Sequence, residues 1–254
     1  MKRLFLKPLQ VAVCLLLVSF APLPTKHIKV YLVGDSTIAN KEVRAYPETG
    51  WGMPFRYFFD STVTVDNRAR NGRSTKSFIN EGLWQPVVDN LKEGDYVLIQ
   101  FGHNDEGKEK VGRYTTPDEF KANLKRYVAE TRSKKAIPVL ITPVARRTFE
   151  GTQVKESHPI YTDAVIEVAK QNNVPLIDLD KKSMELLQQL GHETSKLLYD
   201  YVQPNENPNY PEGKQDDTHF SELGARKMAE IVLAEIRNLH LELADRIVKP
   251  SVKK

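Results

Sequence analysis

The chain has 254 residues, of which 40% are hydrophobic and 28% charged, a composition typical of a folded protein with a hydrophobic core. Its formal net charge is +4, and three of the positive charges (Lys2, Arg3 and Lys7) precede an apolar run at the N-terminus. Without them the chain carries about +1, which argues against a nucleic-acid partner.

The N-terminal segment has a basic head, an apolar run over 9–20 and a proline-containing exit over 21–24. The run is shorter than the roughly 20 residues that a membrane-spanning helix needs. We therefore interpret residues 1–25 as a secretory signal peptide and 26–254 as one domain. A secreted or periplasmic protein without stable membrane insertion follows; a retained anchor is the alternative.

Cys14, the only cysteine, lies inside the apolar run, so the mature chain would contain none. Disulfides, thiolate metal sites and a cysteine nucleophile are then excluded. The six histidines show no paired metal-ligand spacing, and no phosphate loop or dinucleotide glycine pattern occurs. We expect neither a metal nor a cofactor.

Strand-like and helix-like segments alternate along the chain. Apolar strands are predicted over 28–33, 62–67, 95–101, 138–142 and 174–178. Helices are predicted over 51–60, 78–90, 117–134 (with Thr116 as cap), 159–171, 181–190 and 221–239. This order predicts a five-stranded parallel sheet in a three-layer α/β/α sandwich of the flavodoxin-like kind. Because ligands bind beyond the carboxyl ends of such strands, we expect the site there, with the Pro- and Asn-rich loop 200–217 shaping a cleft.

The first predicted strand is followed by Gly34-Asp35-Ser36-Thr37. A glycine beside a small nucleophile lets the backbone turn sharply and exposes the hydroxyl near unpaired backbone N–H groups. Ser36 is therefore a candidate nucleophile. The tetrapeptide alone is also consistent with an ordinary turn in which Ser36 or Thr37 caps a helix.

Two further candidates follow the second and third strands. Gly72 can direct its N–H toward a developing oxyanion, or it can simply occupy a turn. Asn104 can donate its side-chain amide to the same oxygen. His103, beside it, is interpreted as a hydrogen-bonding residue without a role in proton transfer.

A base and its partner precede the last helix in Asp216-Asp217-Thr218-His219. A serine hydroxyl needs a base at neutral pH, and His219 has a suitable side chain. Asp216, three residues earlier, can turn back to the ring; Asp217 is the less favoured alternative, because its side chain diverges. Asp217 or Ser221 can also cap the helix, which is compatible with catalysis.

These positions, in this chain order, resemble the SGNH (GDSL) hydrolase superfamily. Thr37 stands where the family name has leucine. The segments 34–39, 48–52, 71–74, 101–105 and 216–220 are more specifically similar to rhamnogalacturonan acetylesterases of carbohydrate esterase family 12, over about 28–239. The resemblance implies Ser36, Asp216 and His219 as catalytic residues, and an oxyanion hole formed by Ser36, Gly72 and Asn104.

The implied activity is that of a secreted serine esterase that removes O-acetyl groups from an acetylated plant cell-wall polysaccharide or oligosaccharide, with rhamnogalacturonan favoured. We expect Trp51, Arg73 and His103 to contact the sugar, although Trp51 is equally suited to the core. Arg70, Arg146 and Arg147 are further candidates for binding a uronate. A lipase or thioesterase of the same superfamily and a noncatalytic glycan-binding module remain alternatives.

Overall fold

The computed structural model describes residues 26–249, so the predicted signal peptide lies outside the described residues. Its centre is a sheet of five parallel strands in the order β2-β1-β3-β4-β7. The strands are β1 (Ile28–Gly34), β2 (Val63–Asn67), β3 (Tyr96–Gln100), β4 (Ile137–Ile141) and β7 (Leu176–Ile177). The predicted five-stranded parallel sheet is confirmed.

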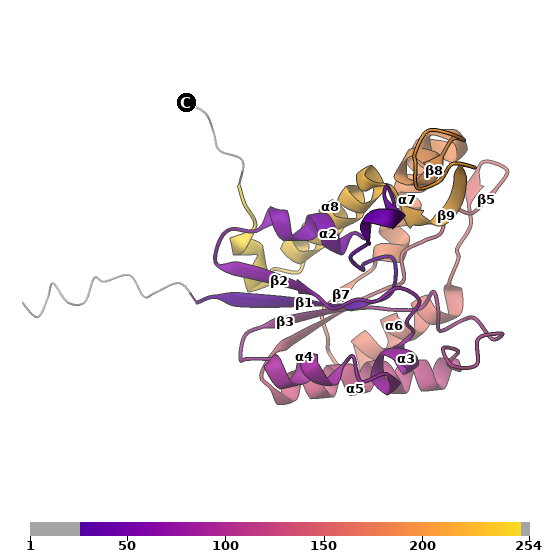
Figure 1. The fold of residues 1–254 in the computed structure, drawn as a ribbon. Helices are drawn as coiled ribbons and strands as arrows, with labels where there is room; N and C mark the ends of the chain where they lie inside the picture. Colours follow the sequence, from indigo (N-terminus) through magenta and orange to yellow (C-terminus); the bar gives the residue numbers. More distant parts are fainter. Residues whose placement is uncertain (1–25, 250–254) are drawn as a thin grey trace, which may run out of the picture.

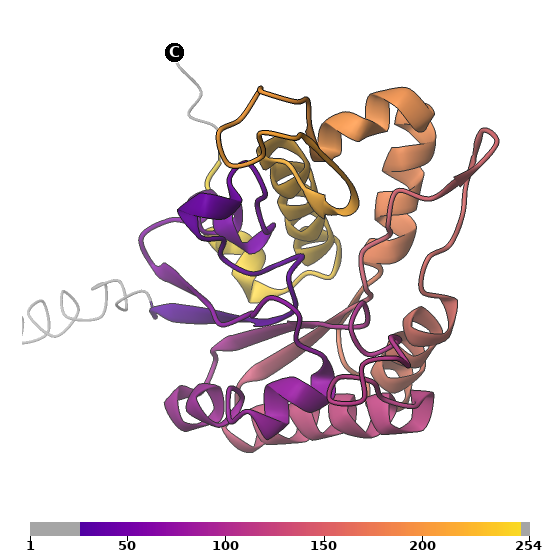
Figure 2. The same ribbon diagram turned by 45° about the vertical axis from the view of Figure 1, so that its right-hand side comes forward.

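Helices cover both faces of the sheet (Figures 1 and 2). One layer contains α3 (Thr75–Asn80), α4 (Gln85–Asn90), α5 (Pro117–Ser133) and α6 (Pro159–Gln171). The other contains α2 (Gly52–Phe55), α7 (Leu179–Thr194) and α8 (Glu222–Asn238). Alternate residues of each strand face opposite layers. Val30 and Leu32 of β1 therefore pack with the second layer, and Tyr31 and Val33 with the first, which confirms the three-layer sandwich.

Shorter elements connect the strands and helices of the sandwich. Four are 3-10 helices: η1 (Val43–Ala45), η2 (Arg56–Phe58), η3 (Ser195–Leu198) and η4 (Glu242–Arg246). Two are antiparallel pairs: β5 (Phe149–Glu150) with β6 (Gln153–Val154), and β8 (Tyr199–Val202) with β9 (Lys214–Phe220). The segment predicted as the loop 200–217 therefore begins and ends in paired strands, the loop itself spans 203–213, and β9 extends through His219.

The predicted helices agree with those of the structure to different degrees. Thr116 caps α5 as expected, in a capping box with Glu119, and the bounds of α6 are those predicted. The single helix predicted over 78–90 is wrong: Ser74 caps α3 three residues earlier than expected, and Gly82, at φ 71°, separates α3 from α4. The segment 51–60 forms only one short α-helical turn and η2.

Two histidines are buried beneath the carboxyl ends of the strands. His103, after β3, and His158, at the start of α6, are 8% and 1% exposed, and their ring centroids lie 4.3 Å apart. Burial, together with the nearby His158, lowers the pKa of His103 to about 4. His103 is therefore neutral in the folded protein at pH 7.

Replacing Gly224 should destabilise the fold, because α8 approaches η3 closely at this position. A β-carbon on Gly224 would lie 1.7 Å from the backbone oxygen of Leu198. We expect Gly224→Ala to lower the free energy of unfolding by about 2 kcal/mol or more, measured by urea denaturation. Gly112→Ala is the control, because a β-carbon there meets nothing within 4 Å; equal stabilities of the two variants would contradict the close approach.

Stability should depend on pH through His103. The unfolded chain protonates this ring near pH 6.5, whereas the folded protein does so near 4. Its contribution is therefore complete above pH 6.5 and is lost as the pH falls to 4, about 3 kcal/mol in all. As the pH falls from 6.5 to 4, the free energy of unfolding of His103→Gln should fall less steeply than that of the wild type. The exposed control, His27→Gln, should follow the wild type. Parallel curves for wild type and His103→Gln would refute this.

Candidate active site

A buried polar scaffold holds the turn that carries Ser36, directly after β1. The Asp35 carboxylate accepts hydrogen bonds from the backbone N–H of Thr37 (2.9 Å) and from its hydroxyl (2.8 Å). Gln100 Nε2 donates to the same hydroxyl oxygen (2.8 Å), and Trp51 Nε1 donates to Gln100 Oε1 (2.8 Å). These four side chains are at most 1% exposed, whereas Ser36 is partly exposed. The scaffold therefore presents the hydroxyl at the surface of a rigid base.

His219 lies against this hydroxyl. Its Nε2 is 2.9 Å from Ser36 Oγ, and its Nδ1 is 2.8 Å from Asp216 Oδ2. The other carboxylate oxygen of Asp216 accepts the backbone N–H groups of Thr218 (2.8 Å) and His219 (2.9 Å). Burial opposes ionisation, but the His219 ring and these two N–H groups hold the pKa of Asp216 well below its usual range. The three side chains thus form a continuous hydrogen-bonded chain.

Asp217, the alternative partner for the histidine, points elsewhere. Its Oδ1 accepts from Arg147 Nη1 and from the Tyr201 hydroxyl, each at 2.6 Å. Successive side chains of β9 alternate between its two faces, which separates Asp217 from Asp216. The structure therefore brings Asp216, and not Asp217, to His219.

The hairpin that carries His219 is fixed to the first loop of the sheet. Phe220 accepts a hydrogen bond from the backbone N–H of Thr49 (2.8 Å), and Ser221 donates one to Leu198 (3.2 Å). Ser221 also caps α8, since its hydroxyl accepts from the N–H of Gly224 (3.2 Å). The capping expected for Ser221 thus coexists with the histidine two residues before it.

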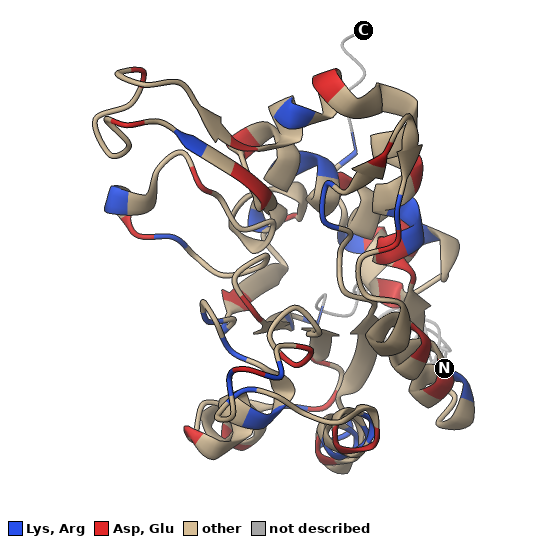
Figure 3. Cartoon of the chain, turned by 90° about the vertical axis from the view of Figure 1, so that its right-hand side faces the viewer, with Lys and Arg blue, Asp and Glu red and all other residues tan. Residues whose placement is uncertain are grey.

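The loops after β2 and β3 meet the Ser36 loop at the carboxyl edge of the sheet, the edge that faces the viewer in Figure 3. Arg70 donates its backbone N–H to Gly34 (3.0 Å), and Asn104 Nδ2 donates to the backbone oxygen of Arg73 (3.1 Å). Gly72 lies between these two contacts with φ +72°, a conformation that glycine adopts without strain. Like Ser36, Gly72 and Asn104 are partly exposed. Residues from three strand ends therefore border one surface.

Two of the expected sugar contacts are corrected by the structure. The Trp51 ring is fully buried and packs edge-on against Phe55, so it belongs to the core. His103 is buried against His158, with Nδ1 3.4 Å from Asp35 Oδ2, and is likewise closed to a sugar. The sequence pattern placed both near Ser36 but carried no information on which way the side chains point.

The remaining arginine candidates differ in how their charge is used. Arg73 is partly exposed and pairs with Glu81 at 2.8 Å. Arg146 pairs with Glu106 at 3.3 Å, and Arg147 with Asp217 at 2.6 Å. Three of the arginines proposed as uronate ligands are thus already neutralised by carboxylates.

Two other arginines beside Gly72 are not neutralised in this way. Arg113, which no sequence motif singled out, lies so close that a β-carbon on Gly72 would be 3.1 Å from its Nη1. Arg70 is exposed. Within residues 26–249, neither guanidinium has a carboxylate within 4 Å. Both charges are therefore free to meet an anionic ligand.

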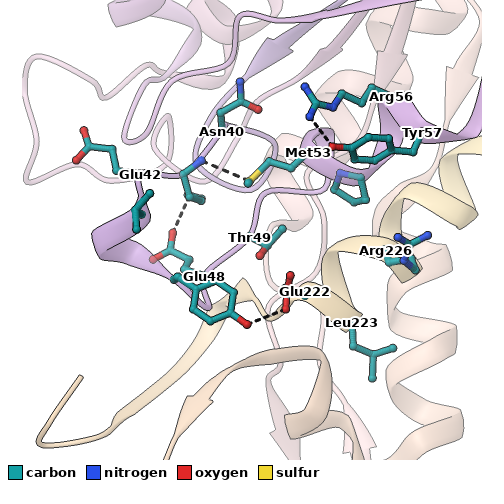
Figure 4. A pocket seen from close by; sticks show the side chains of 14 residues that line it. Asn40, Glu42, Glu48, Thr49, Met53, Arg56, Tyr57, Glu222, Leu223 and Arg226 are labelled. Atoms are coloured by element: carbon teal, nitrogen blue, oxygen red, sulfur yellow. Dashed lines mark hydrogen bonds and ion pairs between the residues drawn. The ribbon is translucent and has the colours of Figure 1, made fainter. Parts of the chain in front are cut away.

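A cleft of about 740 Å³ lies beside the hydrogen-bonded chain, between η1, α2 and the start of α8 (Figure 4). Glu48 and Thr49 form one wall, and the exposed rings of Tyr46 and Tyr57 border it. Ser36 is not among its lining residues. The cleft lies on the Glu48 side of the hydrogen-bonded chain, and neither Asp216 nor His219 lines it.

Between residues 26 and 249, His, Cys, Asp and Glu side chains form no group of three that could hold a metal ion. In the same range, no helix is both long and apolar enough to cross a membrane. Basic and acidic residues are interspersed on the face shown in Figure 3.

The arrangement has the parts needed for nucleophilic catalysis. A serine hydroxyl within hydrogen-bonding distance of an imidazole can lose its proton as it attacks a carbonyl carbon. A carboxylate on the far ring nitrogen fixes the tautomer and stabilises the imidazolium that forms. The tautomer that fits has the proton on Nδ1, facing Asp216, and leaves Nε2 free to accept from Ser36.

Comparison with known proteins agrees with this geometry. Residues 32–227 match the model of the GDSL-like Lipase/Acylhydrolase family. The chain is 42% identical to rhamnogalacturonan acetylesterase RhgT of Bacillus subtilis (strain 168), over 88% of this chain and 95% of that protein. It is 38% identical to the probable rhamnogalacturonan acetylesterase YesY of the same organism, over 87% and 97% of the two chains.

A solved structure shows the same fold: that of protein YxiM from Bacillus subtilis superimposes with a TM-score of 0.73 and 25% identity, over 86% of this chain and 58% of that one. The family match covers more than half of the chain, and the matched residues include Ser36, Asp216 and His219. The chain belongs to the GDSL-like lipase/acylhydrolase family and is a carboxylic ester hydrolase.

Proposed function

We propose that the enzyme removes O-acetyl groups from an acetylated plant cell-wall polysaccharide, with rhamnogalacturonan as the favoured polymer, through an acetyl-Ser36 intermediate. The observation that carries this proposal is the unbroken chain from Asp216 through His219 to Ser36, at 2.8 and 2.9 Å. The choice of acyl group and polymer is supported by the 42% identity to a rhamnogalacturonan acetylesterase along nearly its whole length.

In the first half of the proposed reaction, His219 Nε2 takes the proton of Ser36 while Oγ bonds to the acetyl carbonyl carbon. The backbone N–H groups of Ser36 and Gly72 and the amide of Asn104 stabilise the oxyanion. The imidazolium then gives its proton to the departing sugar oxygen as the C–O bond breaks. Water repeats the sequence on acetyl-Ser36, releasing acetate and restoring the hydroxyl.

An anionic polymer would match the charges around the oxyanion loop. Arg70 and Arg113 flank Gly72 without a carboxylate partner among the described residues. A guanidinium binds a uronate carboxylate through two parallel hydrogen bonds, a geometry that a lysine does not offer. We therefore propose that these arginines bind the uronate that lies next to the acetylated sugar in the pectic backbone.

We further propose that the enzyme acts outside the cytoplasm, where such a polymer is found. The basic and apolar segment 1–25 supports export. Sequencing the N-terminus of the protein recovered from the producing cells tests this, because export with cleavage predicts a start near residue 26 and retention predicts the intact segment.

Removing the nucleophile should abolish turnover. We expect Ser36→Ala to lower kcat/KM on p-nitrophenyl acetate by at least about 10³-fold, and Asp216→Asn by a similar factor, because the histidine loses its orienting anion. Asp217→Asn is the matched control and should stay within about threefold of wild type. Retention of most activity by Ser36→Ala would overturn the mechanism, and a preference for long acyl chains would point to a lipase instead.

Removing the Arg113 guanidinium beside Gly72 should weaken binding of the polymer without changing turnover of a small ester. We expect Arg113→Gln to raise KM for acetylated rhamnogalacturonan about threefold or more, with kcat on p-nitrophenyl acetate unchanged. Acetate release measured at low and high salt checks this, because the loss should shrink as salt screens the charge. Arg126→Gln, on the outer surface of α5, is the control. Equal KM values for both variants would remove Arg113 from substrate binding.

A further inference from the structure

A cluster of largely buried charges adjoins Asp216 and contacts the same carboxylate oxygen, Oδ2, as His219 does. Lys214, two residues earlier on β9, has its Nζ 2.6 Å from Asp200 Oδ2, 3.0 Å from Glu48 Oε2 and 3.6 Å from Asp216 Oδ2. Asp200 belongs to β8 and is fully buried, and Glu48 comes from the segment before α2. One ammonium thus contacts carboxylates from three parts of the chain.

The cluster continues to the oxyanion loop. Lys41 Nζ pairs with Glu48 Oε1 at 2.6 Å and donates to Asn71 Oδ1 at 2.9 Å. The Lys41 side chain is only 2% exposed. Figure 4 shows Glu48 at the wall of the cleft. A chain of polar contacts therefore leads from Asp216 to Asn71, the residue before Gly72.

Burying this many charges is costly unless they compensate one another. Two ammonium groups face three carboxylates: Lys41 and Lys214 against Glu48, Asp200 and Asp216. The cluster is one negative charge in excess, which a protonated His219 would neutralise. Burial works against the charge on Lys214, but its bonds to Asp200 and Glu48 raise its pKa, so the ammonium persists.

We propose that Lys214 is a positioning residue for catalysis: its ammonium holds the Asp216 carboxylate in line with His219 Nδ1, and through Glu48 and Lys41 it couples that carboxylate to the loop of Gly72. The inference rests on the proposed function, because it assigns a role within the same site. It explains why Lys214 and Asp200, neither of which lines the cleft, take part in the contacts beside Asp216.

The proposal predicts opposite electrostatic effects at the two ends of the Lys214–Glu48 pair. Lys214 Nζ lies within roughly 6.5 Å of His219 Nδ1, a separation at which a unit charge shifts a titration by half a pH unit or more. Lys214 disfavours the imidazolium and Glu48 favours it. The other charged groups around this ring and its neighbours are Asp216, Asp200, Asp35, Lys41, Arg146 and Asp217.

The test compares Lys214→Met, Lys214→Arg and Glu48→Gln with wild type, and with Lys227→Met on the surface of α8 as control. Two quantities are measured: kcat and KM on p-nitrophenyl acetate across pH, and the titration of the His219 ring by NMR. We expect Lys214→Met to lower kcat about tenfold at nearly constant KM and to move the acid limb and the ring titration to higher pH. Glu48→Gln should move both to lower pH, and Lys214→Arg should recover most of kcat.

A folded Lys214→Met with the kcat and the titration of wild type would overturn the proposal. If this variant does not fold, the double variant Asp200→Asn/Lys214→Met is used, because it also removes the carboxylate that loses its partner. A wild-type kcat in the double variant would likewise overturn the proposal. Wild-type protein without turnover on any acetyl ester would refute the proposed function instead. In that case the opposite shifts of the His219 ring titration still decide the role of Lys214.

Discussion

The 2.9 Å contact between His219 Nε2 and Ser36 Oγ joins residues 183 positions apart, and the rest of the site depends on it. Proton transfer tolerates little displacement, since a shift of about 1 Å can cost a hundredfold in rate. The serine is fixed by the buried bonds among Asp35, Thr37 and Gln100. The histidine is fixed by a hairpin outside the central sheet. Both supports must hold for the two side chains to meet.

The two supports use different physical means. Under Ser36, direct hydrogen bonds inside the core link Asp35 to Thr37 and Thr37 to Gln100. Behind His219, ion pairs provide the support: β9 carries Lys214 and Asp216 on one face, and the Asp216 carboxylate contacts both the Lys214 ammonium and the His219 ring. The pairing of Asp200 with Asp216 across the hairpin brings a further carboxylate within reach of the lysine. Charge compensation thus sets the shape of the base side of the site.

Much of this arrangement follows from local patterns. The apolar strands predict the parallel sheet, and a parallel sheet gathers its carboxyl ends on one edge, so the sequence predicts that Ser36, Gly72 and Asn104, which follow β1, β2 and β3, lie at the same edge. The Pro- and Asn-rich sequence indicates the loop 203–213, but not the strands β8 and β9 on either side of it, because their pairing depends on contacts between residues far apart in the chain. The sequence pattern also does not predict which way side chains point. Trp51 and His103 are buried, and Arg113, from a segment without any motif, lies beside Gly72.

The central claim is that Ser36 itself carries the acetyl group during turnover. Rapid acid quenching of the enzyme with an acetyl ester, followed by proteolysis and mass spectrometry, tests it most directly. We expect a peptide that contains Ser36 and is heavier by one acetyl group; it should be absent from Ser36→Ala and longer-lived in a variant of His219. Acetylation of another residue, or turnover without any acetylated peptide in wild type and the His219 variant, would contradict it.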